Sequence, residues 1–106
     1  MEVNIKKSTK SKKKLMATFF KDNKKIKTVH FGSAPNKDFT IYSKELDKEG
    51  ANKKKEAYIK RHQVREDFNK FMTAGSLSRW ILWNKTTVES SIRDYLKRFK
   101  LKRKKN

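Results

Sequence analysis

Ala74-Gly-Ser-Leu-Ser-Arg-Trp-Ile-Leu-Trp-Asn84 is the stretch around which this chain must fold. It concentrates large apolar side chains in a sequence otherwise crowded with lysine: Leu77, Trp80, Ile81, Leu82 and Trp83. Burying each one stabilises a fold by about 1.5–3 kcal/mol, so a chain this polar must use them. The stretch is too apolar on every side for a surface helix and too short to be stable alone. We therefore predict a helix over residues 76–84 that forms the hub of the core.

Downstream of the hub, the sequence predicts an amphipathic helix over residues 87–99. Its apolar residues recur at the spacing of one helical face: Val88, Ile92, Tyr95, Leu96 and Phe99. The preceding sequence Thr86-Thr-Val-Glu89 fits a reciprocal capping box. The predicted structural core comprises Leu77, Trp80, Ile81, Trp83, Ile92 and Leu96.

Upstream of the hub, residues 52–66 form another predicted helix, with Asn52 as its N-cap. Its apolar stripe is thin, so this helix must lie on the sheet or against the tryptophan helix. Residues 43–50 are ambiguous, because Ser43 could cap a helical turn that Gly50 would interrupt.

The N-terminal half predicts a small antiparallel sheet. Residues 15–20 and 25–32 are rich in β-branched and aromatic side chains, and the Asp22-Asn23 pair between them favours a hairpin. Residues 38–42 are an expected third strand. The fold class is therefore α+β, a sheet of about three strands packed against two or three C-terminal helices. We expect a flexible basic arm over residues 1–14, a single domain over 15–99 and a basic tail over 100–106; residues 1–5 could add an edge strand.

Charge is the strongest functional signal. The 106 residues include 30 lysines and arginines against 11 acidic residues, a formal charge of +19. Such self-repulsion is destabilising, and its usual reason is binding to DNA, RNA or an anionic membrane surface. No run approaches the roughly 18 apolar residues of a membrane span, and the charged N-terminus is unlike a signal peptide. With no cysteine, disulfides and thiolate metal sites are excluded. We expect a soluble protein, intracellular or packaged in a particle, without membrane insertion.

Several strings along the chain carry a family resemblance. They are Lys7-Ser-Thr-Lys10, Lys14-Leu-Met-Ala17, Lys27-Thr-Val-His-Phe-Gly32, Asp38-Phe-Thr40, Tyr58-Ile-Lys-Arg-His62 and Ala74-Gly-Ser-Leu-Ser-Arg-Trp-Ile-Leu-Trp-Asn-Lys85. Over residues 6–99 their order and spacing resemble a family of small basic proteins, uncharacterised in function, of giant nucleocytoplasmic DNA viruses of algae and amoebae. The resemblance implies a viral origin and a place in the virion or viral factory, in the host cytoplasm or nucleus. The chain departs from that pattern at Thr86, where proline is expected, and at Ser11-Lys12, where Pro-Gly is expected.

No arrangement of residues predicts catalysis, a metal or a cofactor. A zinc or acid–base site would need His30 and His62 to converge with a carboxylate such as Asp38, Asp47 or Glu66. The sequence contains no glycine-rich phosphate loop and no nucleophile elbow. We therefore expect a protein that is not an enzyme.

The aromatic residues favour core packing over ligand stacking. Trp80 and Trp83 could stack on unpaired bases, but large apolar residues are too scarce to spare them. The same argument applies to the aromatic residues of the predicted sheet, which could otherwise form a stacking platform: Phe19, Phe20, Phe31, Phe39 and Tyr42. Arg79 could reach solvent, stack on Trp83, pair with Glu66 or Asp94, or contact a phosphate.

The spread of charge predicts sequence-independent electrostatics rather than base reading. The candidate nucleic-acid contacts are Lys6, Lys7, Lys10, Lys12, Lys13, Lys14, Lys53, Lys54, Lys55, Lys60, Arg61, Arg65, Arg79, Lys85, Lys97, Arg98, Lys102 and Arg103. We predict a non-enzymatic nucleic-acid-binding protein that coats or condenses viral DNA, with DNA favoured over RNA. Two alternatives stay open: a minor capsid protein whose basic arms bind other capsid proteins, and an RNA- or ribosome-associated factor. A homodimer is also open, since so apolar a helix could complete its burial across a two-fold axis.

Overall fold

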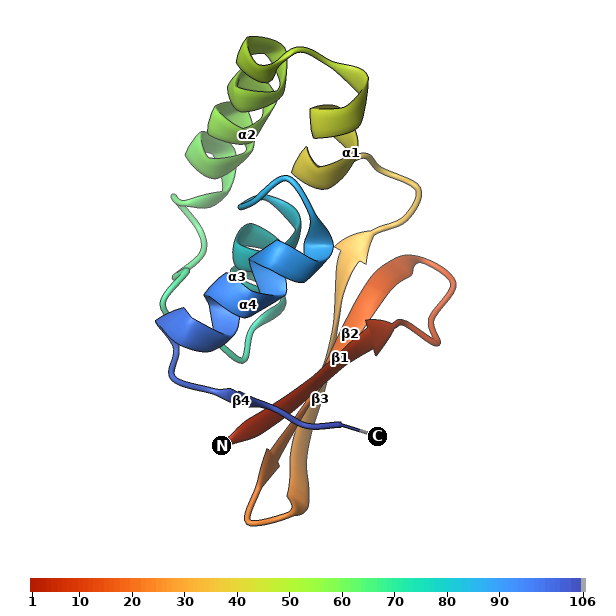
Figure 1. Ribbon diagram of the computed structural model, residues 1–106, viewed down its shortest axis with the longest axis vertical. Helices are drawn as coiled ribbons and strands as arrows, with labels where there is room; N and C mark the ends of the chain where they lie inside the picture. The colour runs from red at the N-terminus through yellow and green to blue at the C-terminus, as the bar shows by residue number, and fades with distance from the viewer. Residues whose placement is uncertain (106) are drawn as a thin grey trace.

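The computed structural model describes residues 1–105 as an α+β fold, which confirms the predicted class. Its strands are β1 (Glu2–Lys7), β2 (Lys13–Lys21), β3 (Lys24–Ser33) and β4 (Lys102–Arg103). Its helices are α1 (Phe39–Glu45), α2 (Lys48–His62), α3 (Ala74–Leu77), the π-helical turn η1 (Ser78–Leu82) and α4 (Val88–Arg98). Figure 1 shows α3 and α4 beside the sheet and the α1–α2 pair at the far end of the molecule. No helix within residues 1–105 is long and apolar enough to cross a bilayer.

The sheet has the strand order β3-β2-β1-β4, and its register separates two faces. β1 and β3 run antiparallel to β2, so directly opposed residues share a face. The face toward the helices carries core side chains. On this face buried Val3 lies opposite buried Phe19, and buried Phe31 lies opposite the partly buried Leu15. The opposite face carries Met16 and other residues, most of them polar.

Residues 2–7 and 102–103 are strands of the sheet, so the predicted flexible arm over 1–14 and basic tail over 100–106 are wrong for these residues. β1 pairs with β2 along its whole length, and β4 pairs in parallel with β1. Val3 and Leu101 supply the reason, because they are 1% and 9% exposed in the core. In the sequence, the surrounding lysines make these two segments look polar, so the burial of the two apolar residues was not predicted. The folded domain therefore extends beyond the predicted 15–99.

The predicted third strand over 38–42 is wrong, because Phe39–Glu45 is helix α1. Asp38 decides this outcome: its side chain accepts hydrogen bonds from the backbone amides of Thr40 and Ile41 and so caps the helix. Phe39 and Ile41, spaced by two, had suggested a strand, but a cap satisfies amides that a strand would have needed to pair.

Helix α2 begins earlier than predicted and ends at His62 rather than residue 66. Asp47, not Asn52, is the N-cap, and its carboxylate accepts from the Gly50 amide at 2.7 Å. Gly50 therefore lies in the first turn, where it does not interrupt the helix. The buried side of α2 is thin, as expected, with Ala51 and Tyr58 as its buried residues.

The tryptophan segment is helical but starts at Ala74, capped by Thr73, and widens into a π turn over Ser78–Leu82. The Trp83 amide donates to the Ser78 carbonyl at 3.1 Å, five residues back. The core prediction is confirmed for Leu77 and Ile81, both fully buried, and for Ile92. The remaining predicted core residues, Trp80, Trp83 and Leu96, are partly exposed and pack against that cluster.

Helix α4 confirms the predicted amphipathic helix with its start shifted by one residue. Thr87, not Thr86, is the N-cap, and its hydroxyl accepts from the Ser90 amide. Glu89 takes no part in this cap and instead contacts Arg103 near the chain end. Tyr95 is fully buried and donates from its hydroxyl to the Phe71 carbonyl, which ties the helix to the preceding connection.

Candidate nucleic-acid interface

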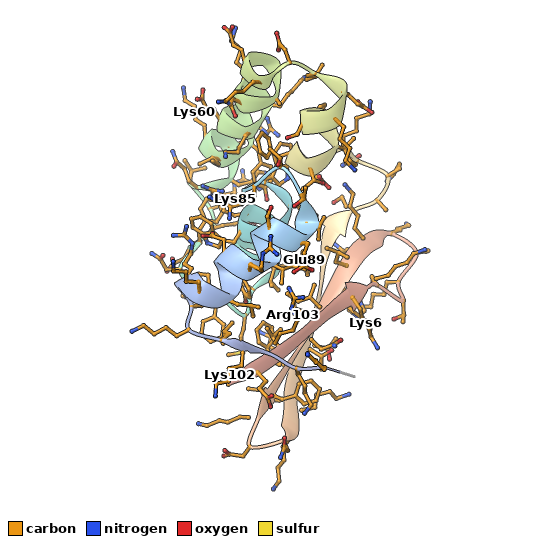
Figure 2. The ribbon with its side chains drawn as sticks, in the orientation of Figure 1. Lys6, Lys60, Lys85, Glu89, Lys102 and Arg103 are labelled. Carbon is orange, nitrogen blue, oxygen red and sulfur yellow. The ribbon has the colours of Figure 1, made fainter. Side chains whose placement is uncertain are left out.

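The predicted cations run along the whole length of the molecule instead of gathering in one patch. Figure 2 shows Lys60 toward the α2 end, Lys85 beside α4, and Lys102 and Lys6 toward the sheet, along the 43 Å longest dimension. Twelve of the eighteen are exposed and form no ion pair with another described residue: Lys6, Lys7, Lys10, Lys12, Lys13, Lys54, Lys60, Arg61, Arg65, Lys85, Lys97 and Lys102. Their charges are available to an external anion.

Four of the other six are ion-paired with acids: Lys14, Lys53, Arg98 and Arg103. Lys14 Nζ lies 2.6 Å from the buried carboxylate of Asp38. Arg103 donates two hydrogen bonds to the Glu89 carboxylate, at 3.2 and 2.8 Å, and this contact holds the pKa of Glu89 below its ordinary value. Lys53 pairs with Glu49 at 3.5 Å, but both side chains are highly exposed, so this pair restrains Lys53 little.

Lys55 has a structural role. Its ammonium donates to the Asn84 carbonyl at 2.9 Å and lies 4.5 Å from the centre of the Phe39 ring. Burial lowers the pKa of Lys55, and the nearby positive charge of Arg79 lowers it further. This side chain therefore joins α2 to the loop after η1 and is a poor candidate for contact with a ligand.

Arg79 and Arg98 both lie against Trp80. Their guanidinium carbons are 4.2 and 3.7 Å from the centre of a Trp80 ring, which suits cation–π attraction. The indole is itself fixed, because its N–H donates to the Phe68 carbonyl at 2.8 Å. Stacking of Arg79 on Trp83 was one of the sequence-based predictions, but Arg79 stacks on Trp80 instead. It donates a hydrogen bond to the Trp83 carbonyl at 2.7 Å.

This cluster has more positive than negative charge. Burial and the neighbouring Arg98 both lower the pKa of Arg79, so the two cations repel one another. Asp94 is their nearby acid, and it lies 3.3 Å from Arg98 while also accepting a hydrogen bond from Asn84 at 2.7 Å. Arg98 is 41% exposed, so it can turn part of its planar fork toward a phosphate, whereas Arg79 is held inward.

On the outer face of the sheet, Lys6 was predicted from the sequence, whereas Lys25 and Lys104 were not. The register places Lys6 beside Met16 and His30, and Lys25 beside Phe20. With Lys104, they border a hollow of about 530 Å³ lined only by the strands and their connections. The pairing of β1 with β2 was the missing signal, because alternation alone cannot say which strands adjoin.

The histidines have ordinary structural partners. His30 Nδ1 is 2.7 Å from the Ser8 hydroxyl. His62 stacks on Tyr58 with ring centres 4.2 Å apart, and its Nδ1 lies 3.6 Å from Glu66. Within residues 1–105, no three histidine or acidic side chains gather as a metal ion would require.

Comparison with known proteins gives a family but no described activity. No curated protein and no solved structure matches the chain. One family of unknown function, DUF5754, matches residues 3–62, which span β1 to the end of α2 and stop before the tryptophan segment. Because the match covers more than half of the sequence, this chain belongs to the DUF5754 family of unknown function.

Proposed function

We propose that this protein is a non-enzymatic, largely sequence-independent nucleic-acid-binding protein that acts mainly on DNA. One observation carries the proposal: among residues 1–105, six of the 30 lysine and arginine side chains form ion pairs. A surplus of this size repels itself in the folded state, and a polyanion relieves the repulsion.

The dimensions of the surface suit a duplex. DNA carries one phosphate charge per about 1.7 Å of axis, so a duplex lying along the 43 Å longest dimension of the molecule passes it with about 25 phosphates, of which only those on the near side can be contacted. The free cations lie on strands, helices and connections alike. This distribution favours contacts with the phosphate backbone of the DNA over readout of base edges.

The viral part of the proposal comes from the resemblance of the sequence strings. On that basis the protein coats or helps to condense viral DNA, in the virion or viral factory. The capsid alternative depended on free basic arms, whereas residues 2–7 and 102–103 are strands of the sheet. We therefore favour DNA as the partner over a capsid protein.

Affinity measured against salt tests the proposal. Fluorescence anisotropy with a labelled duplex should show binding that weakens about 10³–10⁵-fold between about 50 and 200 mM salt, if roughly 6–10 phosphates are contacted. Micromolar or weaker binding with a flat salt dependence would refute it. Competition with duplex RNA of the same length tests the preference for DNA, and fractionation of virions into shell and genome-containing core tests the capsid alternative.

Charge-removing variants locate the surface. The triple variant Lys60→Gln, Lys85→Gln, Lys102→Gln removes three unpaired charges along the long axis (Figure 2). If each contacts one phosphate, the salt slope should fall by about 2–3. A matched triple variant in the β2–β3 hairpin, Lys21→Gln, Lys24→Gln, Lys27→Gln, removes the same charge from residues outside the predicted contacts and should lower the slope less.

A further inference from the structure

A cleft of about 520 Å³ opens between the start of β2, the end of β3, α2 and α3. This volume is in the range of small-ligand pockets. Apart from Lys13, Lys14 and Arg61, the residues that line the cleft are not among the predicted nucleic-acid contacts.

One wall of the cleft is a column of three stacked rings. Tyr58 lies parallel to Trp83, with ring centres 4.3 Å apart and planes at 4°. His62 stacks on Tyr58 at 4.2 Å. Burial, with the nearby carboxylate of Glu66, raises the pKa of Tyr58 to about 12, so its hydroxyl stays protonated at neutral pH. This wall is therefore aromatic, and a planar ring packs well against aromatic surface.

The rim of the cleft is positive. Lys13 and Arg61 are exposed and form no ion pair with another described residue, while Lys14 is already paired with Asp38 and Lys37 with Glu45. Three rings stacked in one column also do not form the box of crossed rings that surrounds an ammonium ligand. A cationic ligand is therefore disfavoured, and an anionic group at the rim is favoured.

Glu66 adds an acceptor inside this positive rim. Its Oε2 has no hydrogen-bond partner among the described residues, since His62 Nδ1 at 3.6 Å is too far to donate well. Gly75 makes room for the carboxylate, because a Cβ there would lie 2.6 Å from it. Oε2 is itself buried, but the side chain as a whole is 34% exposed, so a rotation about its last torsion would be needed to bring this oxygen to a ligand in the cleft.

A planar ring, a hydrogen-bond donor on it and an attached anion together describe a nucleotide with an amino-bearing base. We propose that the cleft binds such a nucleotide unpaired, with its base beside the Trp83–Tyr58–His62 column, its amino group donating to Glu66 and its phosphate near Lys13 and Arg61. The nucleotide can come from a single strand or be free in solution. This site goes beyond the proposed function because it needs an unpaired base, although it shares Lys13 and Arg61 with the basic surface.

The test compares oligodeoxycytidylate and oligodeoxythymidylate of about eight nucleotides, a length that one single-strand module covers. Cytosine has an amino group that a glutamate can accept from, and thymine has none, so oligodeoxycytidylate should bind about fivefold or more tightly. Glu66→Gln should weaken its binding and reduce this preference. Without a base contact, removing a negative charge from so basic a protein should instead strengthen binding of both oligonucleotides.

Two arginine variants supply a matched comparison. Arg61→Gln and Arg65→Gln each remove one exposed charge near the end of α2, but only Arg61 lines the cleft. Arg61→Gln should weaken oligodeoxycytidylate binding several-fold more than Arg65→Gln. Equal effects of the two, together with stronger binding by Glu66→Gln, would overturn the cleft proposal.

Two further measurements distinguish the source of the nucleotide from the function of the basic surface. Competition of cytidine monophosphate against labelled oligodeoxycytidylate would indicate that the cleft takes a free nucleotide. Competition by unlabelled oligodeoxycytidylate alone would indicate a strand. Competition by neither would overturn the proposal. Binding of duplex DNA by the same variants reports on the long surface. If duplex binding and its salt dependence persist while the oligonucleotide results fail, the cleft proposal falls and the proposed function stands.

Discussion

Asp38→Ala should destabilise the fold more than the loss of a helix cap explains. The Asp38 carboxylate accepts from the Thr40 amide at 2.9 Å and the Ile41 amide at 3.3 Å, which caps α1. The same carboxylate lies 2.6 Å from the Lys14 ammonium of β2, and Asp38 is only 3% exposed. One side chain thus both starts α1 and fastens it to the sheet.

The magnitude follows from these two roles. Losing an N-cap costs about 1 kcal/mol. Breaking a buried ion pair costs about 3–5 kcal/mol when the remaining charge stays buried. Lys14 is 19% exposed and can turn toward solvent, so the second cost should fall below that range. We expect a total of about 3 kcal/mol, a large part of the roughly 5–15 kcal/mol that stabilises a typical domain.

Urea denaturation followed by tryptophan fluorescence measures this loss, and α2 supplies the control. Asp47 also caps a helix, through the Gly50 amide at 2.7 Å, but it is exposed and has no ion pair among the described residues. Asp47→Ala should therefore cost about 1 kcal/mol. Adding Lys14→Met to Asp38→Ala should recover part of the loss, because it removes the unpaired ammonium. If Asp38→Ala costs no more than Asp47→Ala, or Lys14→Met recovers nothing, the proposed fastening of α1 is refuted.

Three further changes have defined outcomes. Trp80→Ala removes a ring that packs on the core and should cost about 3 kcal/mol in denaturation experiments, so a fully stable variant with lost DNA affinity would contradict its structural role. Gly32→Ala should cost about 2–4 kcal/mol, because φ is +80° and the new Cβ would lie 2.5 Å from Leu82; an unchanged melting temperature would count against this geometry. Arg103→Gln should lower the melting temperature above the unfolded-state pKa of Glu89, and the difference should vanish as the pH falls through the lower folded-state pKa. A difference that persists in acid would show that Arg103 acts by some other contact.

The hairpin and the last helix were predictable because their signals are local. Asp22 and Asn23 adopt positive φ angles of 53° and 64°, the conformation that residues of this type tolerate in a tight hairpin turn. Val88–Arg98 follows its amphipathic stripe, and even the misplaced cap differed by one residue. In both elements the deciding residues are within a few positions of one another.

The remaining elements depend on contacts that a local pattern does not contain. Val3 and Leu101 are 98 positions apart in the sequence, yet β1 and β4 adjoin in the sheet. The strand-like spacing in residues 38–42 gave way to a helix because the Asp38 carboxylate is also held by Lys14 from β2. The cleft was equally hidden, because Glu66 and Trp83 are brought together only by the packing of α2 against the tryptophan segment.

The tryptophan segment links the two proposed sites through its two sides. Leu77 and Ile81 fill the core, while Trp80 supports Arg98 on one side and Trp83 lines the cleft on the other. A core change such as Ile81→Ala should therefore disturb both sites together, since it shifts the backbone that holds both indoles. Arg98 does not line the cleft, so Arg98→Gln should weaken duplex binding and spare the oligonucleotide preference. Glu66→Gln should leave duplex binding in place and reduce the oligonucleotide preference. That pattern would mean that this segment positions the contacts with nucleic acid on both sides.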